Sequence, residues 1–365
     1  MTSLRAKADE MSFGVYVHVP FCAARCDYCA FATWTDRAHL MADYAAACVT
    51  ELRAATLPPA TSVFFGGGTP SLLPAELLLS VLDVVSRAEG AEVTVECNPD
   101  TVSAALFAAY RAAGVNRVSF GVQSMVPHVL RGLGRSHSID HVRTAVALAA
   151  DAGFDSYNVD LIYGGAGESM ADWEATLAAV LALDPAPLHV SAYALTVEPG
   201  TPLAADPARH PDDDDQADKY LRADAMLAAA GLRNYEISNW ARPGYECRHN
   251  LLYWSQGDYR GIGCAAHSHE AGRRWWNVRT PERYIAAITD GRSPVAADET
   301  LDGRTRALER LQLALRTSAG VPRAAIATAD DLTSAELLFA VDPDTVALTP
   351  RGRLLANEVA ARLRT

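Results

Sequence analysis

Short apolar runs alternate with helix-spaced segments through the first two hundred residues of the chain. The segments between the runs, such as DYAAACVTELRAA (43–55) and AELLLSVLDVVSRAE (75–89), place apolar residues at helical spacing. Strands that alternate with helices predict right-handed βαβ units and a parallel sheet, either doubly wound or closed part-way as a TIM-type barrel. The six runs that predict strands are VYVHVP (15–20), SVFFGG (62–67), EVTVEC (92–97), RVSFGVQ (117–123), YNVDLIYG (157–164) and HVSAYAL (189–195).

Polar and glycine-rich residues gather just after these strands. The segments that follow the strands include FCAARCDYC, GGGTP, ECNPD, GVQSM, DLIYGG and YALTVEPGTP. In a barrel, the loops at the carboxyl ends of the strands build the functional site. The pattern therefore predicts one site at that mouth.

The character of the chain changes after about residue 200. A loop and an acidic segment precede a helix that ends near Gly231, and the pattern beyond is less regular. We expect three parts: a flexible N-terminus at 1–12, the α/β unit with the six predicted strands at 13–231, and a smaller C-terminal α/β domain at 232–365.

Composition narrows the class of protein. Of 365 residues, 50% are hydrophobic and 21% are charged, as in a soluble globular protein with a large core. No apolar stretch is long enough for a membrane helix, and the first dozen residues lack the apolar core of a signal peptide. We therefore expect a cytoplasmic protein, with reduced thiols at its seven cysteines. The net charge of −12 argues against nucleic acid as the main partner but leaves a transient membrane association open.

Three cysteines, Cys22, Cys26 and Cys29, stand within eight residues directly after the first predicted strand. Clustered thiolates select zinc or an iron–sulfur cluster. Structural zinc needs four ligands, which His18 or His39 could complete. A 4Fe-4S cluster held by three cysteines keeps one iron open for a ligand from outside the chain. Three ordinary buried thiols are the remaining interpretation.

The spacing Cys-x3-Cys-x2-Cys, with Tyr28 before the third cysteine, resembles the signature of the radical S-adenosylmethionine (SAM) enzymes. That resemblance implies a 4Fe-4S cluster on the three cysteines, with SAM chelating the fourth iron. It also implies a partial (β/α)6 barrel of TIM type, in agreement with the six predicted units.

The resemblance extends to the residues that meet SAM in this family. It implies SAM contacts from the GGGTP loop, where the backbone of glycine can approach a ligand closely. One departure is visible: Gly165-Ala166 stand where the family members that this chain most resembles usually have Leu-Pro after DLIYG. The implied SAM-binding residues are Tyr16, Gly67, Gly68, Thr69, Glu96, Gln123, Arg135, Asp160, Ala194 and His267. His267 lies in GIGCAAHSH (261–269), and in an extended strand His269 would lie on the same face as His267.

VYVHVPFC, GGGTP, GVQS and DLIYG together resemble two related groups, the oxygen-independent coproporphyrinogen III dehydrogenases and the HemW-type heme chaperones. The dehydrogenases have a further cysteine where this chain has Phe31, and a long N-terminal extension before the first strand. HNLLYW (249–254) matches a motif typical of the chaperones. The resemblance therefore favours a chaperone that binds heme and delivers it to membrane respiratory proteins, with the dehydrogenase as the alternative.

This resemblance also implies a homodimer, although no sequence feature specifies one. It leaves open whether SAM is cleaved or only bound, and an unrelated radical SAM substrate is a third interpretation. His249 is the predicted heme ligand, because histidine ligates heme iron and the neighbouring aromatic residues offer flat apolar surface. A packing role for His249 is the competing interpretation. Cys247 is either a thiolate ligand or a buried thiol.

Overall fold

A computed structural model describes residues 12–154 and 156–364 of the chain. The flexible N-terminus predicted at 1–12 lies outside the described residues, apart from Ser12.

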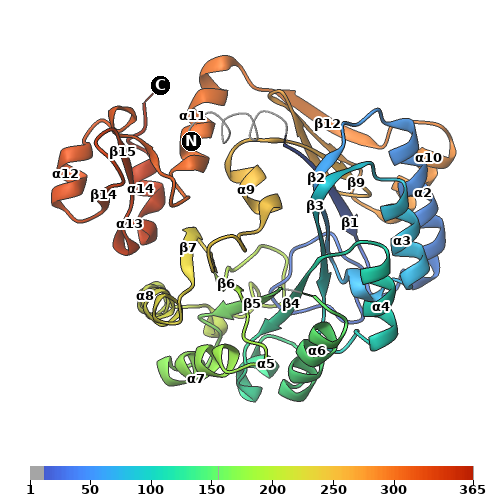
Figure 1. Cartoon of the computed structure of the whole chain (residues 1–365), viewed down its shortest axis with the longest axis horizontal. Helices are drawn as coiled ribbons and strands as arrows, with labels where there is room; N and C mark the ends of the chain where they lie inside the picture. Colours follow the sequence, from blue (N-terminus) through green and yellow to red (C-terminus); the bar gives the residue numbers. More distant parts are fainter. Residues whose placement is uncertain (1–11, 155, 365) are drawn as a thin grey trace.

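The six predicted strands are all present and lie side by side in chain order, each parallel to the next. Helices follow the strands and cover the outer face of the curved sheet (Figure 1). The prediction of an α/β fold with a TIM-like (β/α)6 partial barrel is confirmed. The strands are β1 (Phe13–Val19), β2 (Ala60–Gly67), β3 (Arg87–Cys97), β4 (Arg117–Gln123), β5 (Tyr157–Tyr163) and β6 (His189–Ala194); the helices are α2 (Met41–Ala54), α3 (Ala75–Asp83), α4 (Ala104–Ala112), α5 (Pro127–Gly132), α6 (Ile139–Asp151), α7 (Met170–Leu181) and α8 (Asp213–Ala229).

The helix predicted at 75–89 is shorter than its apolar spacing suggested. It ends at Asp83, and β3 begins at Arg87. The backbone N–H of Ala60 donates to the carbonyl of Ser86 at 2.8 Å, and Arg87 pairs with Ala60 in the parallel ladder. Sheet pairing with β2 thus overrides helical spacing over the last residues of this segment.

The second half of the chain continues the same sheet on both sides of the barrel. The twelve strands run in the order β12-β11-β10-β9-β1-β2-β3-β4-β5-β6-β8-β7, and β9 is parallel to β1. The domain boundary at 231/232 stays a prediction, since strands from both sides of it share this sheet. The added strands are β7 (Arg233–Glu236), β8 (Asn239–Ala241), β9 (Asp258–Ile262), β10 (His267–Glu270), β11 (Arg273–Asn277) and β12 (Val295–Thr300).

A small lobe beyond residue 315 has its own sheet and its own apolar core (Figure 1). Its core includes Leu315, Val346 and Val359, all less than 1% exposed. Helix α10 (Pro281–Thr289) packs near α2, and α11 (Gly303–Ala314) leads into the lobe. The elements of the lobe are β13 (Val321–Pro322), α12 (Ala329–Ser334), β14 (Leu338–Ala340), β15 (Thr345–Leu348), α13 (Pro350–Leu354) and α14 (Ala356–Ala360).

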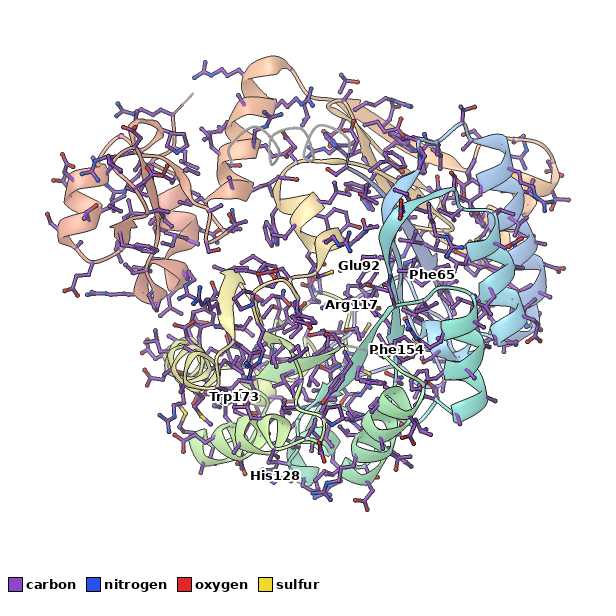
Figure 2. All side chains as sticks on the ribbon, viewed as in Figure 1. Phe65, Glu92, Arg117, His128, Phe154 and Trp173 are labelled. Atoms are coloured by element: carbon purple, nitrogen blue, oxygen red, sulfur yellow. The ribbon has the colours of Figure 1, made fainter. Side chains whose placement is uncertain are left out.

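Helix α9 (Arg248–Trp254) lies inside the curve of the sheet rather than outside it (Figure 1). Gly14 on β1 makes this possible, because a Cβ there would stand 2.5 Å from Leu252. The buried carboxylate of Glu92 accepts hydrogen bonds from the backbone N–H groups of Arg248 and His249 at 3.2 and 3.3 Å. These N–H groups at the start of the helix have no acceptor within the helix itself. Glu92 and Arg117 both point into this interior (Figure 2).

Within the described residues, no helix is long and apolar enough to cross a membrane.

Three charged side chains, two of them fully buried, connect the loop after β5 to α8. The ammonium of Lys219, fully buried, lies 2.6 Å from Asp215 and 3.3 Å from the buried carboxylate of Glu168. Glu168 in turn accepts the backbone N–H of Gly164 at 2.7 Å. The loop after β5 is therefore held to α8 by Lys219.

Replacing Lys219 by Met should cost about 3–5 kcal/mol of unfolding free energy, because Glu168 would lose its buried partner. Urea denaturation measures this loss. Arg222→Ala on the same helix removes an ion pair with Glu174 that is half exposed, and should change stability by about 1 kcal/mol or less. Equal effects of the two variants would contradict a structural role for these three side chains.

Candidate functional site

The cysteine loop leaves β1 at the mouth of the barrel. Cys22, Cys26 and Cys29 are half-buried, and none of them is in a disulfide. The backbone N–H of Cys22 donates to the carbonyl of Trp34 at 3.1 Å, which closes the loop at its base. Phe31, two residues beyond the last cysteine, is 66% exposed.

The loop after β2 lies directly against the cysteine loop. The N–H groups of Gly68 and Thr69 donate to the carbonyls of Val19 and Phe21, both at 2.8 Å. A Cβ on Gly68 would stand 2.7 Å from the carbonyl oxygen of Phe21. Only glycine allows this approach, so the GGGTP loop holds the cysteine loop in position.

Two of the three sulfurs receive a hydrogen bond from a polar side chain. The hydroxyl of Thr69 donates to Cys22 Sγ at 3.7 Å, and Arg135 Nη1 donates to Cys26 Sγ at 3.3 Å. Donors of this kind stabilise thiolate and tune a bound cluster. Arg135 is held by Asn98 Oδ1 at 2.8 Å and by the carbonyl of Gly121 at 3.0 Å, while its Nε has no partner among the described residues.

Three thiols on one loop, two with hydrogen-bond donors, fit the ligand set of a three-cysteine cluster. As they stand, no three His, Cys, Asp or Glu side chains in the described residues are grouped closely enough to hold a metal ion. Desolvation raises the pKa of the Cys22 and Cys29 thiols above its ordinary value. His18 offers no free nitrogen for zinc, because Nε2 donates to the carbonyl of Ala32 at 2.9 Å and Nδ1 accepts from the Tyr16 hydroxyl at 3.1 Å.

Two carboxylates stand on strands of the barrel, Glu96 near the end of β3 and Asp160 in the middle of β5. Glu96, on β3, accepts the N–H of Gly67 at 3.1 Å. Burial, together with the charge of Asp160, raises the pKa of Glu96 to about 8. Asp160, on β5, accepts from the Ser119 hydroxyl at 2.7 Å and from the Asn158 amide at 2.8 Å. Burial also raises the pKa of Asp160.

The predicted SAM residues differ in whether they line a cavity. Tyr16 and Glu96 line both an inner cavity of about 210 Å³ and the larger pocket beside it. Gln123 has a left-handed backbone (φ 64°) at an irregularity of the β4–β5 ladder, and its side chain lies near Gly121 and hence near Arg135. Ala194 is exposed at the end of β6. Neither Gln123 nor Ala194 is among the residues of the described chain that line the two cavities.

His249 lies on α9 beneath the mouth and is 1% exposed. Its Nδ1 is 2.9 Å from the Ser62 hydroxyl and its Nε2 is 2.8 Å from the Tyr253 hydroxyl, so both ring nitrogens are engaged. The ring stacks on Phe64 with centroids 5.3 Å apart, and burial lowers the pKa of His249 to about 3. The heme role of His249 stays a prediction. Cys247 is buried, with its sulfur 3.4 Å from the Glu92 carboxylate.

The larger pocket, of about 820 Å³, opens beside the cysteine loop. The loop contributes Phe31, the SAM-assigned residues contribute Tyr16, Gly67 and Glu96, and β10–β11 contribute the opposite wall. His267, exposed on β10, stacks on Trp276 with centroids 5.6 Å apart. The sequence motif pointed to His267 but not to the aromatic and basic residues that line the pocket with it. Their signal is the strand RRWWN (273–277), where Arg274 and Trp276 fall on one face.

Comparisons with known proteins agree with this geometry. Residues 16–180 match the model of the Radical SAM superfamily. The fold resembles the solved structure of coproporphyrinogen III oxidase (HemN) from Escherichia coli, with a TM-score of 0.82 at 22% identity, covering 96% of this chain and 89% of that one. The barrel, the cysteine loop and these matches define a radical SAM protein. Membership of this class implies a 4Fe-4S cluster and SAM.

Relatives with higher sequence identity show which family of radical SAM proteins the chain belongs to. The heme chaperone HemW of Mycobacterium tuberculosis is 43% identical over 374 residues, covering 96% of this chain and 94% of the relative. HemW of Escherichia coli is 38% identical over 77% of this chain and 74% of the relative. The chain belongs to the HemW family of radical SAM proteins.

Replacing Gly68 by Ala should lower the iron and sulfide content after anaerobic reconstitution to less than half, because the added Cβ forces the two loops apart. The matched control is Gly303→Ala, where a Cβ meets nothing within 4 Å. Metal and sulfide analysis checks both variants. Full cluster content in Gly68→Ala would show that the contact between the loops is dispensable.

The raised pKa of Glu96 predicts a pH dependence of stability. Because the folded-state value of about 8 lies above the ordinary 4.5, Glu96 holds its proton more tightly in the folded state. Its contribution is fully present below pH 4.5 and is lost as pH rises toward 8. Urea denaturation from pH 5 to 8.5 should therefore show a steeper fall in stability for the wild type than for Glu96→Gln. Parallel profiles would contradict the assignment.

Proposed function

We propose that this protein is a heme chaperone that binds heme, a 4Fe-4S cluster and SAM, and delivers heme to membrane respiratory proteins. The observation that carries the proposal is the full-length similarity to proteins named heme chaperone HemW, at 43% identity across 94% of one relative. The pocket beside the cysteine loop supports it, since its volume of about 820 Å³ suits a ligand of cofactor size.

In this proposal Cys22, Cys26 and Cys29 hold the cluster. When bound, a cluster on three cysteines would leave one iron open for SAM and would be able to supply an electron to it; whether SAM is cleaved or only bound is not part of the proposal. Thr69 and Arg135 stabilise the thiolates at Cys22 and Cys26, as their hydrogen bonds indicate. Phe31 stands where a further cysteine is found in the dehydrogenases, so the loop offers three thiols and no fourth.

The SAM-binding role rests on the residues around the two carboxylates. Glu96 suits the SAM amino group, because a positive charge beside it would favour its ionised form. Asp160 can accept from a ribose hydroxyl, and the free Nε of Arg135 faces no protein acceptor among the described residues. The glycine loop offers backbone groups, and Tyr16 and His267 line the adjoining pocket. Gln123 and Ala194 complete the set that the family resemblance assigns.

The family resemblance also supports the finer parts of the proposal. We place the protein in the cytoplasm, with transient association at the membrane where heme is handed over. Membrane respiratory proteins are the proposed heme acceptors, and a homodimer is the proposed assembly.

The alternative function is that of an oxygen-independent coproporphyrinogen III dehydrogenase, an enzyme of heme biosynthesis. The likeness to coproporphyrinogen III oxidase favours it at the level of the fold, since the TM-score is 0.82. At 22% identity, however, that likeness concerns the fold alone. Phe31 in place of the further cysteine argues for the chaperone.

The two functions separate in a paired experiment on the reconstituted protein under anaerobic conditions. One sample is titrated with heme, and the other is incubated with coproporphyrinogen III, SAM and a reductant. The proposal expects about one heme per chain and no decarboxylated product. Decarboxylation at many turnovers per chain would assign the protein to the dehydrogenases, and the absence of heme uptake would exclude the chaperone.

Cys26→Ser should abolish cluster assembly, because a hydroxyl is a poor ligand for iron in such clusters. Iron and sulfide analysis, with the visible absorption of the cluster, measures the effect. Cys48→Ala is the matched control, since its thiol is buried on α2, outside the cysteine loop. A normal iron count in Cys26→Ser would contradict the three-cysteine assignment.

A further inference from the structure

His269, on β10, has the hydrogen-bonding arrangement typical of a metal-ligating histidine. It is 4% exposed and lines the large pocket. Its Nδ1 lies 3.0 Å from the carbonyl of Gly257, so Nδ1 carries the proton and donates it there. The Asp258 carboxylate is 3.4 Å from the same nitrogen. Nε2 is therefore the nitrogen with the free lone pair, and it has no partner among the described residues.

An unpartnered buried nitrogen is costly unless something else occupies it, because desolvation is not offset by a hydrogen bond. Ligating histidines commonly donate the other ring N–H to a carbonyl or carboxylate, which fixes the tautomer and raises the basicity of the ligand. His269 has both acceptors, Gly257 and Asp258. His249 differs, since its two nitrogens are already engaged by Ser62 and Tyr253.

The walls of the same pocket suit a flat, apolar ligand that carries two carboxylates at its edge. The rings of Tyr259 and Trp276 line it, and Tyr259 lies with its ring centroid 6.3 Å from that of His269. Two arginines also line it. Arg274 is paired with Glu299 and Glu309, at 2.8 and 2.5 Å. Arg279 is exposed and has no ion-pair partner within the described chain, so its guanidinium is free for a carboxylate.

We propose that heme binds in this pocket, with Nε2 of His269 as an axial ligand of its iron and Arg279 facing a propionate. The inference rests on the proposed function, and it names the ligand within it. Heme then lies beside the cysteine loop and the SAM-assigned residues, which share the pocket. Because His269 is only 4% exposed, binding at Nε2 requires a side chain of the pocket wall to turn aside.

The test compares the same substitution at two histidines. Anaerobically reconstituted full-length wild type, His269→Gln and His249→Gln are titrated with ferric heme, and absorption and electron paramagnetic resonance spectra are recorded. Glutamine keeps the size and hydrogen bonding at both positions but does not provide an imidazole ligand. His128→Ala is the control, since His128 lies half exposed on α5, away from the pocket (Figure 2). Iron and sulfide content reports correct folding of each variant.

We expect His269→Gln to lose the spectrum of histidine-ligated heme, while His249→Gln and His128→Ala keep it. Imidazole added to His269→Gly should restore that spectrum. An unchanged spectrum in His269→Gln, or its loss in His249→Gln alone, would overturn the inference. Wild-type protein that takes up no heme would instead overturn the proposed function.

Asp258→Asn gives a second test that does not depend on the stability of the histidine variants. The amide keeps the acceptor for the N–H of Ala271, at 2.8 Å in the wild type, but removes the charge near His269. Heme affinity should fall about tenfold, with the iron ligand retained, as for other outer-shell partners of metal ligands. An unchanged affinity and an unchanged reduction potential of the bound heme would contradict the role of His269.

Discussion

The contact between the loops that follow β1 and β2 is the constraint on which the site depends. Two backbone hydrogen bonds join them, from Gly68 to Val19 and from Thr69 to Phe21. These bonds leave no room for a side chain at Gly68. The same loop presents the Thr69 hydroxyl to Cys22 and the Gly67 N–H to Glu96. The proposed cluster ligands and the carboxylate proposed to meet SAM are thus fixed relative to each other by backbone geometry.

The second half of the chain completes this site rather than standing apart from it. Strand β9 pairs with β1 in parallel, which brings β10 and β11 beside the cysteine loop. Helix α9 lies inside the barrel, with its first N–H groups on Glu92 (Figure 2). The large pocket therefore has one wall from the radical SAM barrel and one from the C-terminal region. A ligand held in this pocket would contact both halves of the chain.

Much of this arrangement is readable from the sequence. The six strands follow from apolar runs that alternate with helical spacing, and the cysteine loop and GGGTP follow from their motifs. The end of α3 was not predictable, because sheet pairing at Arg87 decides it. The parallel pairing of β9 with β1 joins residues about 245 positions apart, and no local pattern encodes it. The same limit applies to the two histidines: HNLLYW drew attention to His249, whereas the free nitrogen of His269 is visible only when its neighbours are known.

The most direct test of the central claim is a heme transfer assay. Protein loaded with one heme per chain is mixed with heme-depleted membranes, the two are separated by sedimentation, and heme is measured in each fraction by absorption. A chaperone is expected to lose heme to the membrane fraction, where reduced cytochrome spectra should appear in amounts that match the loss. Heme that stays on the protein, or that enters protein-free lipid vesicles equally fast, would contradict the account.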